Sequence, residues 1–406
     1  MYRLHSAPKK RALALLLCLA ALIGMAAFPA EASAEGWTHV VDVIAGNGYT
    51  VGLRSDGTAL FAGDDVDMAR ALANWNGVVR MEKKGWSYVV GYRSDGSVCV
   101  ASHDPWGYGD GAWTQTELSG WKGITDLHPE YNFCAGLRSD GTVVLVSRDP
   151  EINRYMNSRV ASWQNVTQIC TGYFGILGLR RDGTVEYAGT SREDEEESWG
   201  MEQFPGLRNV RELAAGEYGP YAILNDGSVV PSSRGFTNIE KLYFASDSMF
   251  GLRRDGTVAA FHYYAEDPRI DEVESWHNVA ELGFTVDGWA RYVPTALLAD
   301  GTVRAVTRGY EGEPYGEWDV SGWRDVVRLF SGSYYTVGLR SDGSLLVTGG
   351  EFGSFGFLSQ LGSWRNITRI AVSPCDNIEE GHIVGLHADG TVTAAGNNSH
   401  GQCNIG

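Results

Sequence analysis

A chain of 406 residues with a net charge of −17 can bury a large core, and its length alone would suggest two domains. So acidic a chain repels a phosphate backbone, which excludes nucleic acid as a partner. The six cysteines show no CxxC spacing and have no histidine pair beside them, which argues against a zinc site. We expect neither a metal nor another cofactor.

Residues 1–34 have the pattern of a secretory signal peptide. Basic residues 9–11 precede an uncharged apolar run over 12–28, and residues 32–34 are small enough for cleavage. The run is slightly short for a spanning helix, which needs about 20 residues, so cleavage is favoured over an uncut anchor. Cleavage would leave 29 Lys and Arg against 49 Asp and Glu, a net charge of −20. We therefore expect a secreted, extracellular chain that does not insert into a membrane.

After residue 34 the chain contains nine repeats, each marked by an Asp-Gly dipeptide followed by Thr or Ser. The glycines are Gly57, Gly96, Gly141, Gly183, Gly227, Gly256, Gly301, Gly343 and Gly390. Such a segment between two apolar runs is typical of a hairpin turn that a glycine closes at positive φ. The Asp side chain can also bond its own backbone two residues on. We interpret the nine Asp residues as turn residues, in preference to catalytic or metal-binding ones.

A second signature begins about twenty residues before each Asp-Gly. An aromatic residue and a polar pair lead into alternating apolar positions, which indicates a strand with one buried face. The leading residues are Trp37, Trp75, Trp121, Trp163, Leu207, Phe236, Trp276, Trp323 and Trp364. We interpret these tryptophans as core residues or wedges between units. A glycine later in each unit, such as Gly52, is expected to let strands crowd together near an axis.

Each unit therefore predicts a strand, a short loop, a strand, the hairpin turn, a strand and a long variable loop. One such sheet cannot bury its face alone, whereas radial stacking covers every face. The sequence predicts an all-β fold, a single β-propeller over residues 35–406 with antiparallel blades of three to four strands. The blade number stays open between seven and nine, because one repeat interval is only 29 residues. Residues 401–406 should lie beside Trp37 and close the ring.

Five cysteines remain after residue 34. Cys99, Cys134 and Cys170 lie in apolar strand patterns and are most simply small core residues. An odd number cannot pair completely, so this is not a disulfide scaffold. The states of Cys375 and Cys403, in loops, stay open.

The last repeat, Gly385 to Cys403, resembles the regulator of chromosome condensation repeat in its short bacterial form, and the resemblance extends over residues 36–406. The family implies a propeller, commonly of seven blades. Its eukaryotic founding member is a nuclear guanine-nucleotide exchange factor that binds chromatin, and a signal peptide and an acidic charge argue against both roles here. The secreted propeller-type β-lactamase inhibitors are a closer comparison, and they bind through aromatic loops on one face.

The short loops between the first two strands are rich in aromatic residues and should all lie on one propeller face. Protein interfaces are enriched in such side chains. The candidate partner-binding residues are Tyr49, Trp86, Tyr88, Tyr131, Tyr173, Tyr218, Trp289, Tyr334 and Tyr335, with Trp106 and Tyr108 from a variable loop. The alternative interpretation is that one residue of each pair points inward between blades as part of the core.

The sequence contains no nucleophile elbow, phosphate loop or HExxH motif, so we do not expect an enzyme. The leading hypothesis is a monomeric extracellular recognition module with an unidentified protein partner. The alternative is a carbohydrate-binding propeller, in which aromatic and acidic loop residues stack on a sugar and bond its hydroxyls.

Overall fold

The computed structural model describes residues 36–85, 87–103, 113–172, 175–189, 203–216, 219–231, 235–245, 248–262, 267–286, 292–307, 319–332, 335–349, 356–373 and 381–406. Residues Trp37–Ile405 form one compact unit. A second unit, formed mainly by residues 1–36, lies almost entirely outside the described residues.

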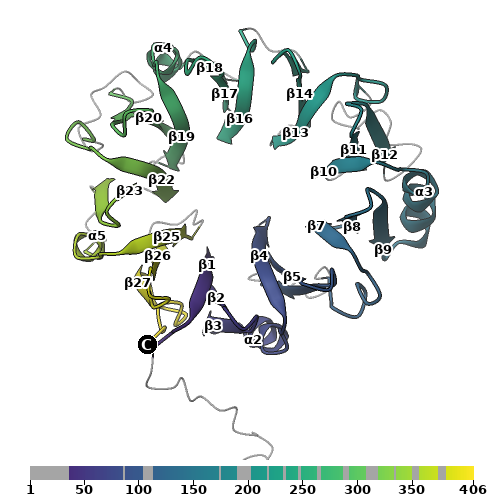
Figure 1. Ribbon diagram of the computed structural model, residues 1–406, viewed down its shortest axis with the longest axis horizontal. Coiled ribbons are helices and arrows are strands. Elements are labelled where there is room, and N and C mark those ends of the chain that lie inside the picture. The colour runs from purple at the N-terminus through teal and green to yellow at the C-terminus, as the bar shows by residue number, and fades with distance from the viewer. Residues whose placement is uncertain are drawn as a thin grey trace, which may run out of the picture. The chain divides into compact units, whose positions relative to one another are not determined.

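The unit Trp37–Ile405 contains nine three-stranded sheets, which we number as blades 1 to 9 in chain order. Around the axis of Figure 1 lie the first strands: β1 (Val40–Gly46), β4 (Val78–Lys84), β7 (Ile124–Pro129), β10 (Val166–Gly172), β13 (Val210–Gly216), β16 (Ile239–Ala245), β19 (Val279–Val286), β22 (Val326–Gly332) and β25 (Ile367–Val372).

The second and third strands of each blade follow outward from the first. The second strands are β2 (Tyr49–Arg54), β5 (Tyr88–Arg93), β8 (Phe133–Arg138), β11 (Gly175–Arg180), β14 (Gly219–Leu224), β17 (Ser248–Arg253), β20 (Tyr292–Leu298), β23 (Tyr335–Arg340) and β26 (His382–His387). The third strands are β3 (Ala59–Gly63), β6 (Val98–Ser102), β9 (Val143–Ser147), β12 (Val185–Gly189), β15 (Val229–Val230), β18 (Val258–His262), β21 (Val303–Ala305), β24 (Leu345–Gly349) and β27 (Val392–Gly396).

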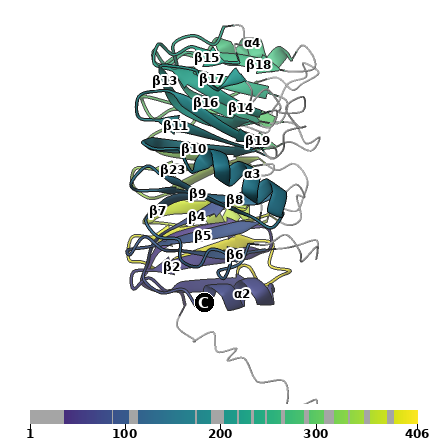
Figure 2. The same cartoon turned by 90° about the vertical axis from the view of Figure 1, so that its right-hand side faces the viewer.

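All pairings within the blades are antiparallel and each blade is one continuous piece of chain, as the order β1-β2-β3 illustrates. In side view the strands run from one face of the ring to the other (Figure 2). The prediction of an all-β propeller is confirmed, with three strands in every blade. The interval of only 29 residues between Gly227 and Gly256 still contains the strands of a complete blade boundary. It is short because β15 has only two residues and β16 begins soon after it.

One backbone hydrogen bond repeats at every seam between blades. The first residue of each inner strand donates its N–H to the carbonyl of the Asp-Gly glycine of the blade before. These bonds of 2.9–3.2 Å join Val78 to Gly57, Ile124 to Gly96, Val166 to Gly141, Val210 to Gly183, Ile239 to Gly227, Val279 to Gly256, Val326 to Gly301, Ile367 to Gly343 and Val40 to Gly390. The last of them joins blade 1 to blade 9, so nine repeats make a ring of nine blades.

Side chains reinforce the closing seam. His382 on β26 contacts Thr50 on β2 through Nε2 and Oγ1 at 2.8 Å, and the Thr50 hydroxyl donates to the carbonyl of Gln402 at 2.8 Å. Trp37 N–H donates to the carbonyl of Ile405 at 2.9 Å. The C-terminal segment therefore lies beside the first blade, as the sequence predicts.

The Asp-Gly turns have the predicted chemistry. Asp56 Oδ1 accepts from the backbone N–H of Thr58 at 2.9 Å and from its hydroxyl at 2.6 Å, and Gly57 has a φ of +82°. The Thr58 hydroxyl, followed by its N–H, holds the pKa of the Asp56 carboxyl below its usual range. The other eight turns repeat this pair of bonds.

The backbone conformation explains which residues occur in the pair after each leading residue. The second member of the pair has a left-handed φ of +57° to +70°, a region that Asn, Asp and Gly tolerate best. The residues are His39, Gly77, Gly123, Asn165, Asn209, Asn238, Asn278, Asp325 and Asn366. In this conformation the carbonyl of the residue points towards an Asp-Gly hairpin. The Ser55 N–H, for example, donates to the His39 carbonyl at 2.9 Å.

The repeated glycine beside the leading tryptophan serves packing rather than strand crowding, which corrects the sequence interpretation. A Cβ at Gly52 would lie 2.7 Å from the Trp37 ring, and one at Gly338 would lie 2.7 Å from the Trp323 ring. The glycine therefore gives the indole a flat surface within its own blade. Phe236 packs on Gly251 in the same way.

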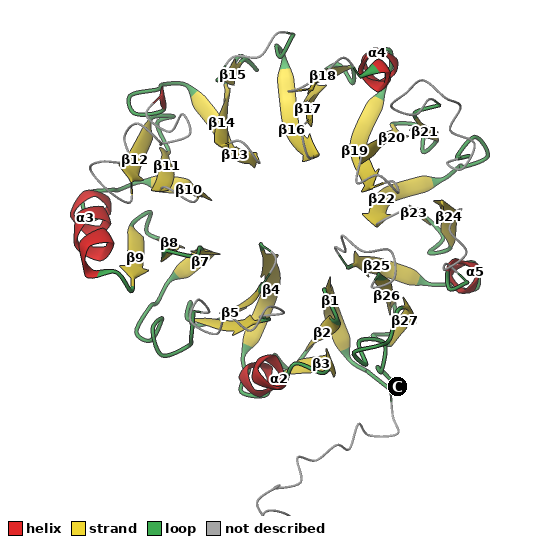
Figure 3. Cartoon of the chain, turned by 180° about the vertical axis from the view of Figure 1, so that it is seen from behind, coloured by secondary structure: helices red, strands yellow, loops and turns green. Residues whose placement is uncertain are grey.

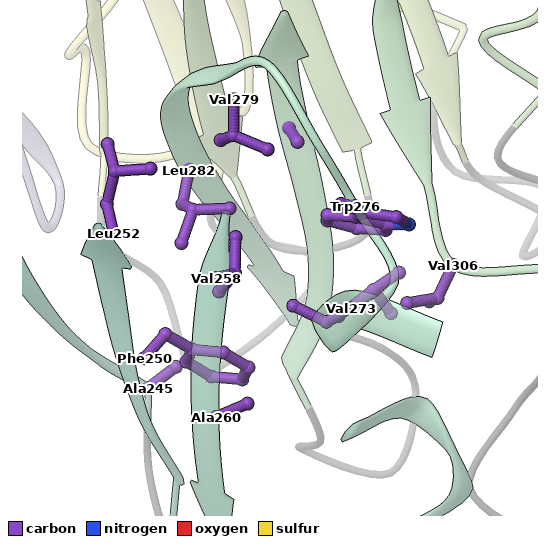
Figure 4. Packing of buried hydrophobic residues seen from close by; sticks show 12 residues of the cluster. Ala245, Phe250, Leu252, Val258, Ala260, Val273, Trp276, Val279, Leu282 and Val306 are labelled. Carbon is purple, nitrogen blue, oxygen red and sulfur yellow. The ribbon is translucent and has the colours of Figure 1, made fainter. Parts of the chain in front are cut away.

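The core is divided into clusters that fill the seams. Figure 4 shows one of them, in which Phe250 and Val258 of blade 6 pack with Leu282 of blade 7 and with Trp276 and Val273 ahead of β19. Val258 and Val273 are fully buried. Each seam is thus an apolar layer between two sheets, which is how a blade covers its faces.

Among the described residues, four short helices follow third strands on the perimeter, a feature that the sequence interpretation missed (Figure 3). They are α2 (Val66–Leu72), α3 (Pro150–Val160), α4 (Pro268–Glu274) and α5 (Leu358–Leu361). Asp65, Asp149 and Asp267 cap the first three through their carboxylates, and Pro follows two of these caps. An Asp followed by Pro is a helix-start signal, so it could have been recognised.

Candidate functional site

The ring has two chemically different faces. The hairpin face carries the nine Asp-Gly turns between second and third strands. The loop face, at the opposite end of the strands, carries the loops between first and second strands, such as residues 130–132. The predicted partner-binding residues belong to the loop face or to segments next to it.

Tyr131 is the predicted residue that the structure leaves most exposed, at 73%. It stands at the centre of a three-residue loop between β7 and β8. Glu130 N–H donates to the Phe133 carbonyl at 2.9 Å, and Phe133 is buried. The loop is tight, so neighbouring side chains point in opposite directions, Phe133 into the core and Tyr131 away from it.

Both neighbours of Tyr131 are fixed from outside the loop. The buried Trp113 donates its Nε1–H to the Glu130 carbonyl at 2.6 Å. The Ser147 hydroxyl donates to the Asn132 carbonyl at 2.7 Å. Tyr131 is therefore an exposed aromatic residue on a backbone that hydrogen bonds hold on each side.

Arg148 extends this surface. Its guanidinium lies over the Trp113 ring, 4.7 Å from the centroid, and its Nε donates to Glu117 at 2.6 Å. The bond from Arg148, with help from Thr114, lowers the pKa of Glu117 to about 2. Arg148 remains partly exposed above the buried Trp113, which also bonds the Glu130 carbonyl next to Tyr131, so this part of the loop face presents a cation.

Tyr49 and Tyr335 are not available to a partner, which corrects their assignment. They are 0% and 1% exposed, as the first residues of β2 and β23. Their rings lie over Gly46 and Gly332, where a Cβ would come within 2.0 and 2.3 Å of a ring carbon. A glycine at the end of the inner strand makes room for the ring, so these two residues are core, as the alternative interpretation had it.

Tyr88 lies between these extremes. It is half-buried at the start of β5, and its hydroxyl accepts from Trp113 N–H at 3.1 Å. Burial raises the pKa of this hydroxyl. The Tyr88 hydroxyl therefore helps to hold the backbone of Trp113 in place. The remaining predicted residues, Trp86, Trp106, Tyr108, Tyr173, Tyr218, Trp289 and Tyr334, lie outside the described residues.

A network on the inner strands of blades 2 to 4 and on the loop after β7 was not foreseen, and we call it the charged wall. It consists of Lys84, Asp126, His128, Thr171 and Glu130. Lys84 Nζ lies 2.7 Å from Asp126 Oδ1, and His128 Nε2 lies 3.0 Å from Asp126 Oδ2. His128 Nδ1 lies 3.0 Å from the Thr171 hydroxyl, which donates to Glu130 at 2.5 Å.

Every member of the charged wall is paired with another. Burial alone would raise the pKa of Asp126, but the bonds and charges of His128 and Lys84 outweigh it and lower that pKa. A carboxylate–imidazole pair can serve as a general base. The Thr171 hydroxyl that His128 contacts already donates its proton to Glu130. We therefore interpret the network as a structural one that holds blades 2, 3 and 4 together.

The described cysteines are inert. Cys99, Cys134 and Cys170 are buried, as predicted, and burial raises the pKa of the Cys99 and Cys170 thiols to about 12. Cys403 is half-buried, and burial raises its pKa to about 11. These thiols stay protonated near neutral pH and are poor nucleophiles. Cys375 lies outside the described residues.

Over the described ranges, no three His, Cys, Asp or Glu side chains come together as metal ligands. Within the same ranges, no helix combines the length and apolar character needed to cross a bilayer. A pocket of about 600 Å³ lies on blade 7, lined by residues that include Trp276, Arg304 and Glu272. Two others, Thr307 and Asp319, border residues 308–318, which the structure does not describe, so we assign the pocket no ligand.

No protein-family model matches this chain, and no curated protein matches it either. Among solved structures, the chain is similar to the computationally designed protein Ika8, with 15% identity over 89% of this chain and 98% of that one and a TM-score of 0.40. It is also similar to Prp20p from Saccharomyces cerevisiae, with 12% identity, coverage of 90% and 84% and a TM-score of 0.35.

A third similar structure is the ectodomain of the receptor kinase CR4 from Physcomitrella patens, with 14% identity over 89% of this chain and 74% of that one and a TM-score of 0.33. No conclusion about activity or partners rests on likenesses of this size. The propeller assignment rests on the nine sheets and their seams.

Proposed function

We propose that this protein is a secreted, monomeric, non-catalytic recognition module that binds a protein partner through its loop face. Tyr131 carries the proposal, because it is 73% exposed on a loop that is pinned at Glu130 and Asn132. Secretion rests on the signal-peptide pattern of residues 1–34 and forms part of the proposal.

A pinned aromatic side chain is suited to binding. Tyrosine offers a large contact area with few rotatable bonds, so it loses little conformational freedom when a partner covers it. Interfaces concentrate their binding energy in Tyr, Trp and Arg, and Arg148 lies beside Trp113 in the same region. The carbohydrate alternative depends on aromatic and acidic residues of the variable loops, and Trp106 and Tyr108 among them lie outside the described residues.

The test is affinity capture of a partner by residues 35–406 from the native surroundings, followed by measurement of the dissociation constant with that partner. Tyr131→Ala should weaken binding at least about tenfold, as a truncated hot-spot aromatic does. The matched control is Val327→Ala, which alters a residue 51% exposed at the opposite, hairpin end of the ring. Equal binding by the Tyr131 variant and the unaltered protein would refute the assignment of the loop face.

A further inference from the structure

The seam between blades 7 and 8 contains two buried hydroxyl groups that have no hydrogen-bond partner among the residues that the structure describes. Thr295 on β20 is 0% exposed, and its Oγ1 is unpaired. Ser331 on β22 has a buried Oγ that is also unpaired. Buried polar groups are almost always satisfied, so two such orphans together point to an absent partner.

Both hydroxyls lie beside Gly283 on β19. A Cβ on Gly283 would lie 2.8 Å from Thr295 Oγ1 and 3.0 Å from Ser331 Oγ. The equivalent position of every other blade carries a side chain. Those residues are Ile44, Glu82, His128, Cys170, Ala214, Tyr243, Phe330 and Ala371.

Thr295 is exceptional at its own position as well. Its equivalents in the other blades carry no aliphatic hydroxyl and are Val51, Val90, Ala135, Leu177, Tyr221, Phe250, Val337 and Val384. Blade 7 thus loses a side chain and gains a hydroxyl at the same place. Since Gly283 is only half-buried, solvent reaches the backbone at this point.

The seam between blades 3 and 4 shows what the missing partner would do. Thr171 there occupies the position of Ser331, and its hydroxyl meets His128 Nδ1 at 3.0 Å. His128 occupies the position of Gly283. The protein itself supplies the partner in one seam, whereas in the other no polar atom of the described residues bonds to either hydroxyl.

We propose that the notch at Gly283, formed with Thr295 and Ser331, binds one oxygen that both donates and accepts hydrogen bonds. A water molecule or the hydroxyl of a polyhydroxylated ligand such as a sugar can supply this oxygen. A neighbouring pair, Thr285 and Thr336, lies at 2.6 Å and needs no such partner.

The deciding experiment is the sign of the stability change in Thr295→Val, measured by thermal unfolding of residues 35–406. If the hydroxyl bonds a bound oxygen, the variant loses that bond and its Tm falls by about 1–3 °C. If the hydroxyl is an unpaired group in a dry seam, removing it leaves the Tm unchanged or raises it, and the proposal is wrong.

A double-mutant cycle and a matched control complete the test. Ser331→Ala should also lower the Tm, and the double variant should lose less than the sum of the two losses, because both hydroxyls share one oxygen. Additive losses would contradict the shared oxygen. Val337→Thr places the same hydroxyl in blade 8, where Phe330 fills the position, and should lower the Tm because no partner can reach it.

The source of the oxygen is settled by crystals grown without additives and by a titration with glucose. Electron density within about 2.7–3.2 Å of both Oγ atoms in the sugar-free crystal identifies water. A glucose-dependent rise in Tm that Thr295→Val abolishes identifies a ligand hydroxyl. Either result supports the proposal. No density in the crystal together with no effect of glucose overturns it.

Discussion

The hairpin face and the loop face differ in how regular they are from blade to blade. On the hairpin face the turn carboxylates are tied to their own backbone, as Asp56 is to Thr58, and each turn glycine serves a seam bond. On the loop face the aromatic residues differ in exposure: Tyr49 and Phe133 begin second strands and are buried, Tyr88 begins β5 and is half-buried, and Tyr131 lies in the loop before β8 and is exposed. The residues that repeat build the ring, and those that do not repeat are free to meet a partner.

The largest effect should follow a change at a repeated packing position. Gly338→Val would drive a branched side chain into the Trp323 ring, which lies 2.7 Å from the site of a Cβ. We expect a loss of about 3–4 kcal/mol, seen as a lower denaturation midpoint in urea. Gly356→Ala, with nothing within 4 Å, is the control and should be nearly neutral. Similar losses in both variants would show that packing on the indole is not the cause.

The second largest effect is a pH dependence of the closing seam. Burial, and then the charge of Lys83, lowers the pKa of His382 from 6.5 to about 4. The folded ring thus binds this proton less readily than the unfolded chain, so the stabilisation is complete above pH 6.5. It is lost as the pH falls towards 4, by about 2–3 kcal/mol.

Urea unfolding at pH 7 and pH 4.5 checks this dependence. His382→Gln removes the titrating group and retains a donor for Thr50, so the variant should lose less stability than the unaltered protein between the two pH values. An equal loss in both proteins would assign the pH dependence to other groups.

An effect of similar size compares glycines of the two faces directly. Gly57 and Gly85 both have positive φ, at +82° and +57°. A Cβ at Gly57 would lie 2.7 Å from Val78 N, the donor of a seam bond, whereas nothing lies within 4 Å of one at Gly85. Gly57→Ala should cost about 2–3 kcal/mol, and Gly85→Ala, which bears only the backbone strain, about 1 kcal/mol. Equal losses in the two variants would show that the close approach of Val78 N to Gly57 adds nothing to the cost.

The smallest effect should be that of Tyr131→Ala on stability. Its side chain is mostly exposed and its loop is held through Glu130 and Asn132, so the free energy of unfolding in urea should stay within about 0.5 kcal/mol of that of the unaltered protein. A larger loss would mean that Tyr131 also supports the fold, and its binding defect would need another explanation.

The ring was predictable because its signals are local. The Asp-Gly turn requires a glycine at positive φ, and a leading tryptophan, or Leu207 and Phe236 in two units, marks each inner strand, so nine units follow from the sequence. The blade number did not follow, because the bond from Val40 to Gly390 joins residues at opposite ends of the chain. The packing of Trp37 on Gly52 was also missed, since a Trp and a Gly far apart in one repeat give no local signal.

The candidate site was less predictable than the ring. Aromatic residues at the ends of strands look alike in sequence, but Tyr49 and Tyr335 have a glycine opposite them in the inner strand and are buried. Gly46 and Gly332 were therefore the signals that could have separated core from surface. The notch at Gly283 depends on three strands of two blades, and no short stretch of sequence contains it.

Amide hydrogen exchange of the mature protein, alone and bound to its captured partner, tests the central claim most directly. A partner on the loop face should slow exchange in the loops between first and second strands, with residues 130–133 among them, and leave the Asp-Gly turns unchanged. Slowed exchange at turn residues 55–58 and their eight equivalents, with no change around Tyr131, would place the partner on the hairpin face and contradict the assignment of binding to the loop face.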